Sequence, residues 1–332
     1  MKEVKKPPYL KEAKKPPYQV GRIPMIRSVG MSLLQSRLRS GQFVITAEIT
    51  PPVSTDPAEF LRRALPLKGL VTAINVTDGA GAKVHLSSLA AAHFLVQAGI
   101  EPIFQMTCRD RNRLALQGDL LGAAAFGIHN ILVLAGDNPA AGDQPDAKAV
   151  YDLDSRGLMA MAHRMRTEKT LPSGTPIAGA FDMVIGAADV PVDPPPGWEP
   201  KGLFAKAQAG ADFVQTQFCM DMGIVRRYAA RLGELGFKLP ILIGVAPIPS
   251  ARSARWMREK LFGTIVPDAI VERLEKAADP KAEGRRICVE ILRELAEIPG
   301  VAGAHVMAPM NFAEIPLAIE ESGVLNKQRK AA

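Results

Sequence analysis

The chain has 332 residues, of which 47% are apolar and 23% charged, so it can bury a large core and has a normal length for one α/β barrel. It contains no run of about 18 uncharged apolar residues and no secretory leader pattern near its start, so neither a membrane span nor secretion is expected. The formal net charge of +7 comes from residues 1–40, which carry ten Lys and Arg against two Glu, whereas the other residues carry 31 basic and 32 acidic side chains. Because the body of the chain is almost neutral, the sequence argues against a nucleic-acid-binding domain, which needs a basic face on the fold itself.

The cysteines and histidines show no metal-binding spacing. Cys108, Cys219 and Cys288 lie far apart and form no CxxC or Cys/His pattern, and the five histidines form no HxxH or HExxH motif. We therefore predict no metal site. This cysteine usage suits a reduced compartment, so a cytoplasmic protein is expected. For Cys219, a buried structural thiol is favoured over a catalytic nucleophile.

The first 40 residues contain a duplication, KEVKKPPYL followed by KEAKKPPYQ. The proline pairs exclude a helix, and the segment has too little apolar mass to fold alone. We expect an extended or disordered arm, and the alternative is a polyproline segment that docks on the body or on another subunit. MSLLQSRLRS (31–40) predicts a short amphipathic helix. The predicted organisation is a basic N-terminal arm and helix over 1–40, a folded body over 41–326 and a tail over 327–332.

From residue 43 onward, short apolar runs rich in β-formers alternate with longer helical stretches. The predicted strands are 43–49, 71–78, 101–108, 130–137, 176–182, 213–218, 240–247 and 304–309. The predicted helices are 57–66, 86–98, 111–126, 155–168, 202–209, 221–236, 250–261 and 281–297. This alternation predicts an α/β fold, a single-domain (β/α)8 TIM barrel. A doubly wound sheet is the runner-up, but no GxGxxG motif follows the first strand.

Polar residues, with Gly136 beside Asp137, stand where these predicted strands end. They are Glu48, Thr77, Asp78, Gln105, Thr107, Asp110, Gly136, Asp137, Asp182, Gln217, His305 and Asn311. Any one of them is compatible with a surface position, and for Asp110 and Asp182 alone that interpretation is favoured. Active sites of such barrels lie at the C-terminal ends of the strands, so together these residues predict a site on that rim.

Glu48 stands out because it interrupts an apolar strand in FVITAEITPP (43–52). With Ile45, Ala47 and Ile49 beside it, we expect its carboxyl group to be desolvated, and desolvation would raise its pKa and let it act as a general acid. Asp137 follows a glycine that allows close backbone approach to a planar ring. Gln217 offers both a donor and an acceptor, which suits an amide-like heterocycle edge.

Six motifs resemble those of a known family. FVITAEITPP, NVTDGAG, QMTCRDRN, ILVLAGDNP, AKAQAGADFVQTQF and LIGVAPI, in this order, resemble the methylenetetrahydrofolate reductase family over residues 42 to 325. The resemblance implies an FAD-dependent barrel that reduces 5,10-methylenetetrahydrofolate to 5-methyltetrahydrofolate by hydride transfer from flavin N5. It implies that Glu48 is the acid that opens the folate ring, that Asp137 lies near flavin and pterin, and that Gln217 binds the pterin. Asn311, on the same rim, is assigned to the substrate site.

The same resemblance implies a set of flavin contacts. They are Thr77, Gln105, Leu134, Ala135, Gly136, Asp137, Val150, Tyr151, Asp152, Asp154, Ala178 and Lys206. Lys206 and the arginines Arg109, Arg111 and Arg113 could meet the FAD diphosphate, although a solvated helix start is at least as good an interpretation of the three arginines.

The sequence departs from the family pattern at three places. Ala135 stands where members have Arg, Gln105 stands where they have His, and a proline-rich stretch near 190–200 replaces a PEVH-like segment. These changes fall on the rim where NAD(P)H, the usual donor, or another reductant would dock. The electron donor therefore stays open among NADH, NADPH and a protein.

Two further hypotheses remain at this point: an enzyme acting on a different one-carbon carrier, and a catalytically inert barrel that serves as a binding subunit. The direction of the reaction, a role in methionine biosynthesis and the formation of a homo-oligomer are not determined by the sequence.

Overall fold

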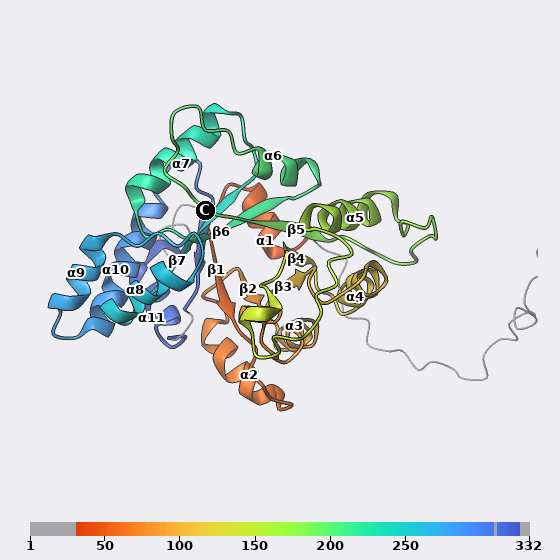
Figure 1. The fold of residues 1–332 in the computed structure, drawn as a ribbon, viewed down its shortest axis with the longest axis horizontal. Coiled ribbons are helices and arrows are strands. Elements are labelled where there is room, and N and C mark those ends of the chain that lie inside the picture. The colour runs from red at the N-terminus through yellow and green to blue at the C-terminus, as the bar shows by residue number, and fades with distance from the viewer. Residues whose placement is uncertain (1–30, 309–310, 326–332) are drawn as a thin grey trace, which may run out of the picture.

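The computed structural model describes residues 31–308 and 311–325, and within them parallel strands close into one barrel in the order β1 to β8 (Figure 1). The strands are β1 (Val44–Ile49), β2 (Ala73–Val76), β3 (Pro102–Thr107), β4 (Asn130–Leu134), β5 (Val184–Asp189), β6 (Phe213–Phe218), β7 (Ile241–Val245) and β8 (Gly303–Val306). Neighbours along the chain pair in parallel, and β8 closes the barrel against β1 with Thr46 opposite His305. The (β/α)8 prediction is confirmed. The predicted arm and tail lie outside the described residues, apart from the helix before β1.

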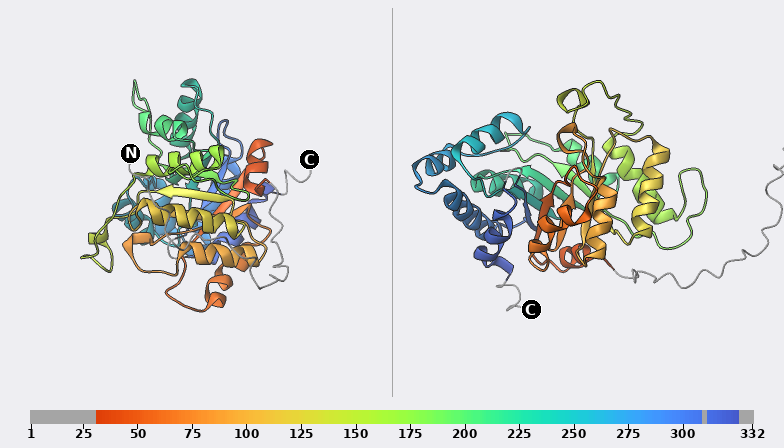
Figure 2. Two further views of the ribbon diagram at one scale, coloured as in Figure 1. Left: turned by 90° about the vertical axis from the view of Figure 1, so that its right-hand side faces the viewer. Right: turned by 90° about the horizontal axis from the view of Figure 1, so that it is seen from below.

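Helices surround the strands (Figure 2). They are α1 (Leu33–Arg39), α2 (Pro57–Ala64), α3 (Ser88–Gln97), α4 (Arg113–Ala125), α5 (Ser155–Glu168), α6 (Lys201–Gln208), α7 (Met222–Glu234), α8 (Ala251–Lys260), α9 (Asp268–Lys276), α10 (Pro280–Leu295) and α11 (Glu314–Ser322). Side-chain caps fix several starts, since Asn112, Asp154 and Asp221 each accept a hydrogen bond from a backbone N–H in the first turn of their helix. Helices α9 and α11 were not predicted. No helix in the described part of the chain is long and apolar enough to cross a bilayer.

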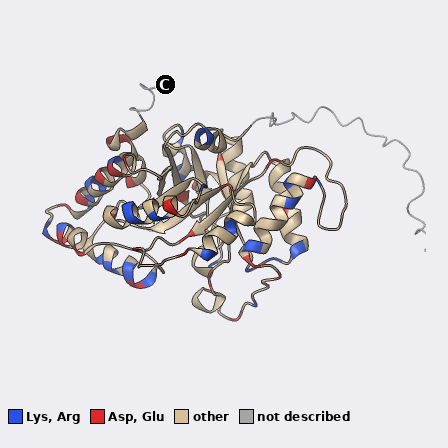
Figure 3. Cartoon of the chain, turned by 90° about the horizontal axis from the view of Figure 1, so that it is seen from above, with Lys and Arg blue, Asp and Glu red and all other residues tan. Residues whose placement is uncertain are grey.

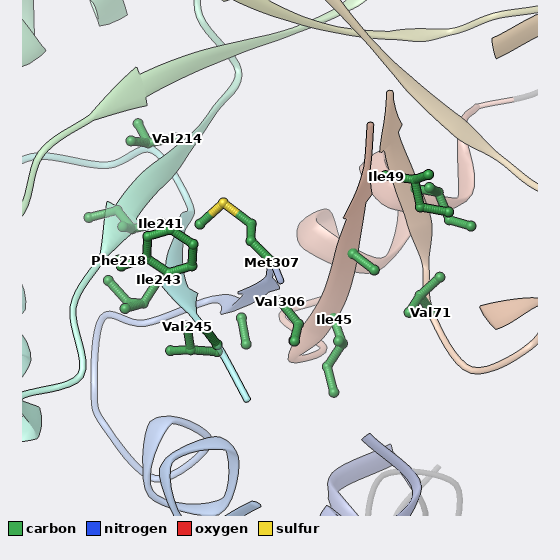
Figure 4. Close-up of a cluster of buried hydrophobic side chains, with 14 of the residues drawn as sticks. Ile45, Ile49, Val71, Val214, Phe218, Ile241, Ile243, Val245, Val306 and Met307 are labelled. Carbon is green, nitrogen blue, oxygen red and sulfur yellow. The ribbon is translucent and has the colours of Figure 1, made fainter. Parts of the chain in front are cut away.

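The strands separate two apolar regions. Ile45, Ala47 and Ile49 belong to the larger cluster, between the strands and the helices, which Figure 4 shows around β1, β7 and β8. Alternate residues point inward, and Val44 joins a smaller cluster that fills the lower lumen together with Phe213. Helix α1 closes this end, because Leu34 packs into the same cluster and Glu101 accepts hydrogen bonds from the N–H groups of Leu33 and Leu34.

The fifth strand is not where the sequence analysis placed it. Residues 176–182 form a mostly exposed connection, and β5 is Val184–Asp189. The sequence VIGAAD was overlooked because small residues weaken its β-pattern. The structure explains the smallest of them, since a Cβ on Gly186 would lie 2.5 Å from the Phe213 ring that fills the lumen.

Candidate active site

A polar layer crosses the barrel above its apolar floor. Thr46, Asn75, Gln215 and His305 are all buried and point into the lumen from four strands. Asn75 and Gln215 exchange two amide hydrogen bonds, of 2.7 and 3.1 Å, and Gln215 Nε2 also donates to Thr46 Oγ1 at 3.0 Å. Thr46 Oγ1 lies 3.0 Å from His305 Nδ1. Of these four residues, only His305 was predicted from the sequence. A sequence pattern could have indicated Thr46 and Gln215. Each stands two positions before another polar residue of its strand, Glu48 or Gln217, and residues spaced by two share one face of a strand.

Glu48 lies one layer higher, at the barrel mouth. Its Oε2 accepts a hydrogen bond from Gln105 Nε2 at 2.7 Å and lies 3.6 Å from His305 Nε2. The side chain is 24% exposed. The expectation of an apolar surrounding is wrong, because strand alternation turns Ile45, Ala47 and Ile49 toward the helices while Glu48 faces the lumen. An amide and an imidazole therefore contact the carboxylate.

The end of β4 brings Asp137 to the same rim. Gly136 has φ +97°, a conformation that favours glycine, and a Cβ there would lie 2.8 Å from Arg109 Cβ. Asp137 is exposed, and its Oδ2 accepts a hydrogen bond from the N–H of Gly81 at 2.7 Å. Gly81 belongs to the short helix η2 (Ala80–Ala82), so the connections after β2 and β4 meet above the barrel. Leu134 is half-buried and Ala135 is exposed beside them.

Three other predicted side chains lie at the mouth and have polar atoms with no hydrogen-bond partner in the described part of the chain. The Thr77 hydroxyl is buried and has no hydrogen-bond partner in the described part of the chain. Half-buried Gln217 accepts a hydrogen bond from the Phe218 N–H through Oε1. Asn311 Nδ2 is buried without a partner among the described residues, beside a small hollow that Trp256 also lines.

The segment 150–154 joins this rim through contacts with residues that follow β3 and β4. The Val150 N–H donates to Arg109 O at 2.7 Å, and the Tyr151 hydroxyl lies 3.4 Å from Gly136 O. Asp152 pairs with Arg113, and Asp154 caps α5.

Ala178 is not brought to this rim. It lies in the exposed connection that precedes β5, at the opposite end of the barrel from Glu48 and Asp137. Asp182, which was also expected at the end of strand five, lies in the same connection and pairs with Lys169. There it lines an open cavity of about 590 Å³ together with Arg39, Arg166 and other residues near α1.

The rim contains a buried ion pair that was not predicted. Asp78 accepts hydrogen bonds from Arg111 at 2.7 Å and from the N–H and hydroxyl of Thr107 at 2.8 and 3.0 Å. Burial acts to raise the pKa of Asp78, but Arg111 and Thr107 outweigh it and hold that pKa below its ordinary value. The pair ties the end of β2 to the end of β3 and to the start of α4.

The arginines suggested for a diphosphate are already engaged. Arg109 pairs with Asp110 at 2.8 Å, Arg111 also contacts Asp119 at 2.7 Å, and Arg113 pairs with Asp152 at 2.8 Å. Acidic and basic residues are also interspersed along helices α9 and α10 (Figure 3). None of the three is therefore a free cation at the rim.

Lys206 is engaged as well. Its Nζ donates to Ala188 O at 2.6 Å and lies 3.9 Å from Asp189 Oδ1, at the true end of β5. Tyr228 donates a hydrogen bond of 2.5 Å to Asp189 Oδ2, and the Trp198 ring lies 5.8 Å from the tyrosine ring. Burial raises the pKa of Asp189, against the opposing effects of Tyr228 and Lys206. Asp189 and Tyr228 were not predicted, because strand five was expected earlier in the chain.

A model of the methylenetetrahydrofolate reductase family matches residues 33–323. The chain belongs to this family. It is 29% identical over 68% of its length to a probable NADPH-type methylenetetrahydrofolate reductase of Caenorhabditis elegans, and 25% identical over 90% of its length to methylenetetrahydrofolate reductase 2 of Schizosaccharomyces pombe. It spans only 32% and 48% of those relatives. An uncharacterized Clostridium thermocellum protein that binds two copies of 5-methyl-5,6,7,8-tetrahydrofolic acid shares the fold, with a TM-score of 0.62 and 15% identity, over 90% of this chain and all of that one.

Proposed function

We propose that the chain interconverts 5,10-methylenetetrahydrofolate and 5-methyltetrahydrofolate, with Glu48 as the general acid and FAD as the hydride carrier. The observation that carries this proposal is the position of Glu48 at the barrel mouth, in a chain of this family, where Gln105 donates to one carboxylate oxygen. The folate bound by the Clostridium thermocellum protein supports a reduced folate as ligand.

The residues on one side of the rim fit a flavin ring. The Thr77 hydroxyl is a buried polar group without a partner among the described residues, and the backbone of Gly136 and Asp137 follows the end of β4 on the same rim. A flavin ring carries carbonyl and N–H groups that such a hydroxyl and backbone can bind. Thr77, Gln105, residues 134–137 and residues 150–154 would hold it. FAD, when bound there, supplies a hydride acceptor and donor.

Glu48 performs the proton chemistry. Opening the five-membered ring of methylenetetrahydrofolate requires a proton on the nitrogen that leaves. Because Gln105 donates to Oε2, the proton of a neutral Glu48 belongs on Oε1, the oxygen left to face a ligand. His305 fixes the same carboxylate from below, and Thr46 holds that ring in place.

Gln217 and Asp137 orient the substrate in this proposal. The Gln217 amide nitrogen is not used by the Phe218 contact, so it can donate to the pterin while the oxygen accepts. Asp137 can exchange its contact with the Gly81 N–H for one with a ring N–H, since it is exposed.

The test is anaerobic mixing of the FAD-supplemented protein with 5-methyltetrahydrofolate. We expect loss of the oxidised flavin absorbance as the methyl group is oxidised to methylene. A protein that binds neither FAD nor the folate contradicts the proposal. Stopped-flow reduction by NADH and NADPH then identifies the donor, and failure of both directs the search to a protein donor.

A further inference from the structure

We infer that Asp189 neutralises Lys206, so that this barrel holds a flavin mainly by its ring end and gains little affinity from the FAD diphosphate. The inference rests on the proposed flavin site and names the residue that sets the flavin preference of that site. It predicts that FAD and riboflavin, which lacks phosphate, bind with similar affinity.

The geometry at the end of β5 supports this assignment. Lys206 Nζ lies 3.9 Å from Asp189 Oδ1 and donates to Ala188 O at 2.6 Å. The lysine side chain is 24% exposed and Asp189 only 18%. Tyr228 holds the aspartate by a 2.5 Å hydrogen bond, so the carboxylate cannot easily turn away to leave the lysine free. A phosphate that approaches Lys206 also approaches this buried negative charge.

The three arginines of this side of the rim do not compensate. Arg109, Arg111 and Arg113 each have an aspartate oxygen within 2.8 Å. The starts of two neighbouring helices are occupied too, since Asn112 accepts from N–H groups of α4 and Asp154 from one of α5. Asp152 and Asp154 add negative charge where a diphosphate would otherwise find donors.

The Thr77 and Gln217 side chains keep unused polar atoms, whereas Lys206 and the three arginines each have a partner. We therefore expect the flavin ring, and not the diphosphate, to provide most of the binding affinity.

The experiment measures dissociation constants of FAD and riboflavin by quenching of flavin fluorescence. In the unaltered protein we expect the two constants to agree within about threefold. Asp189→Asn removes the negative charge beside Lys206 and keeps an oxygen that accepts from Tyr228, while the hydrogen bond from Lys206 to Ala188 O remains. We expect FAD to bind about tenfold more tightly to this variant, as one charged hydrogen bond allows, and riboflavin to change less than about twofold.

Asp193→Asn is the matched control, because Asp193 lies four residues further on, pairs with exposed Arg227 and gives the same change in net charge. It should leave both constants unchanged within about twofold. Lys206→Gln in the otherwise unaltered protein should weaken FAD by less than about threefold. The inference is overturned if the unaltered protein prefers FAD to riboflavin by about 30-fold or more, or if Asp189→Asn does not tighten FAD.

Binding of 5-methyltetrahydrofolate, measured by calorimetry on the same samples, separates this inference from the proposed function. Folate binding with a strong FAD preference contradicts only the inference. If the unaltered protein does not bind the folate, the proposed function is contradicted. The comparison of FAD with riboflavin then still decides the inference. Retained folate binding in Asp189→Asn shows that the variant is folded.

Discussion

Glu48 lies between the side chains of Gln105 and His305, and both contacts involve the same carboxylate oxygen. A carboxyl group placed in this way presents its other oxygen to the barrel mouth. The residues beside it in sequence are apolar, but they face the helices and do not shape its environment. At this scale the reactive group is defined by residues that are distant in sequence, 57 positions away in the case of Gln105.

Glu48→Gln should lower the rate of methyltetrahydrofolate oxidation by about 10²-fold or more, because a glutamine keeps the shape but cannot deliver a proton. The affinity for the folate should stay within about threefold. Rapid-mixing kinetics and calorimetry measure the two effects. Glu199→Gln, at an exposed position, is the control and should react normally. Normal turnover in Glu48→Gln would remove this residue from the mechanism.

At the scale of the strands, β1, β2, β6 and β8 contribute one side chain each to a buried polar layer that supports the site. Its four members satisfy one another inside the lumen, with the Asn75 and Gln215 amides paired in both directions. A buried polar group costs free energy when its partner is removed, so the layer depends on all of its members. It also supports Glu48 from below, because His305 belongs to it.

Asn75→Leu and Gln215→Met should each lower the free energy of unfolding by about 2 kcal/mol, since each leaves one buried amide without its partner. The double variant should cost less than the sum of the two by more than about 0.5 kcal/mol, because no orphaned amide then remains in this pair. Urea unfolding of the four proteins gives these values. Strictly additive costs would mean that the two amides do not act as a pair.

At the scale of the whole molecule, Asp78 joins the elements around the rim. It contacts Thr107 at the end of β3, Ser88 at the start of α3 and Arg111 just before α4. Its side chain is only 8% exposed. Because the pKa of Asp78 is held below its ordinary value of 3.8, its contribution to stability is complete above that value and is lost as the pH falls through the lower, folded-state pKa.

Asp78→Asn should therefore destabilise the protein by about 3 kcal/mol at neutral pH, as loss of one partner of a buried ion pair does. The difference from the unaltered protein should stay constant at higher pH and shrink as the pH falls below 3.8 toward the lower, folded-state pKa, because the aspartate is protonated first in the unfolded and then in the folded chain. Urea unfolding across this range measures it. Asp268→Asn, in an exposed pair with Arg258, should change stability by less than about 0.5 kcal/mol at either pH. A pH-independent effect of Asp78→Asn would contradict the assignment.

The sequence by itself determined the barrel, because alternating short apolar runs and amphipathic stretches are local patterns that each element carries in its own residues. It also placed Glu48, Asp137 and Gln217 on one rim, since the ends of parallel strands meet there. It failed at β5, where small residues fit around Phe213 and leave no local pattern, and so it misplaced Ala178 and missed Asp189.

Only the tertiary structure decided which charges are free. Arg109, Arg111, Arg113 and Lys206 are equally cationic in the sequence, yet each is paired by an acid or a carbonyl group that the fold brings beside it. The interaction between two charges depends on their separation and on burial, and neither quantity is written in the order of residues. For the same reason, the partners of Glu48 became known only when the strands closed into a barrel.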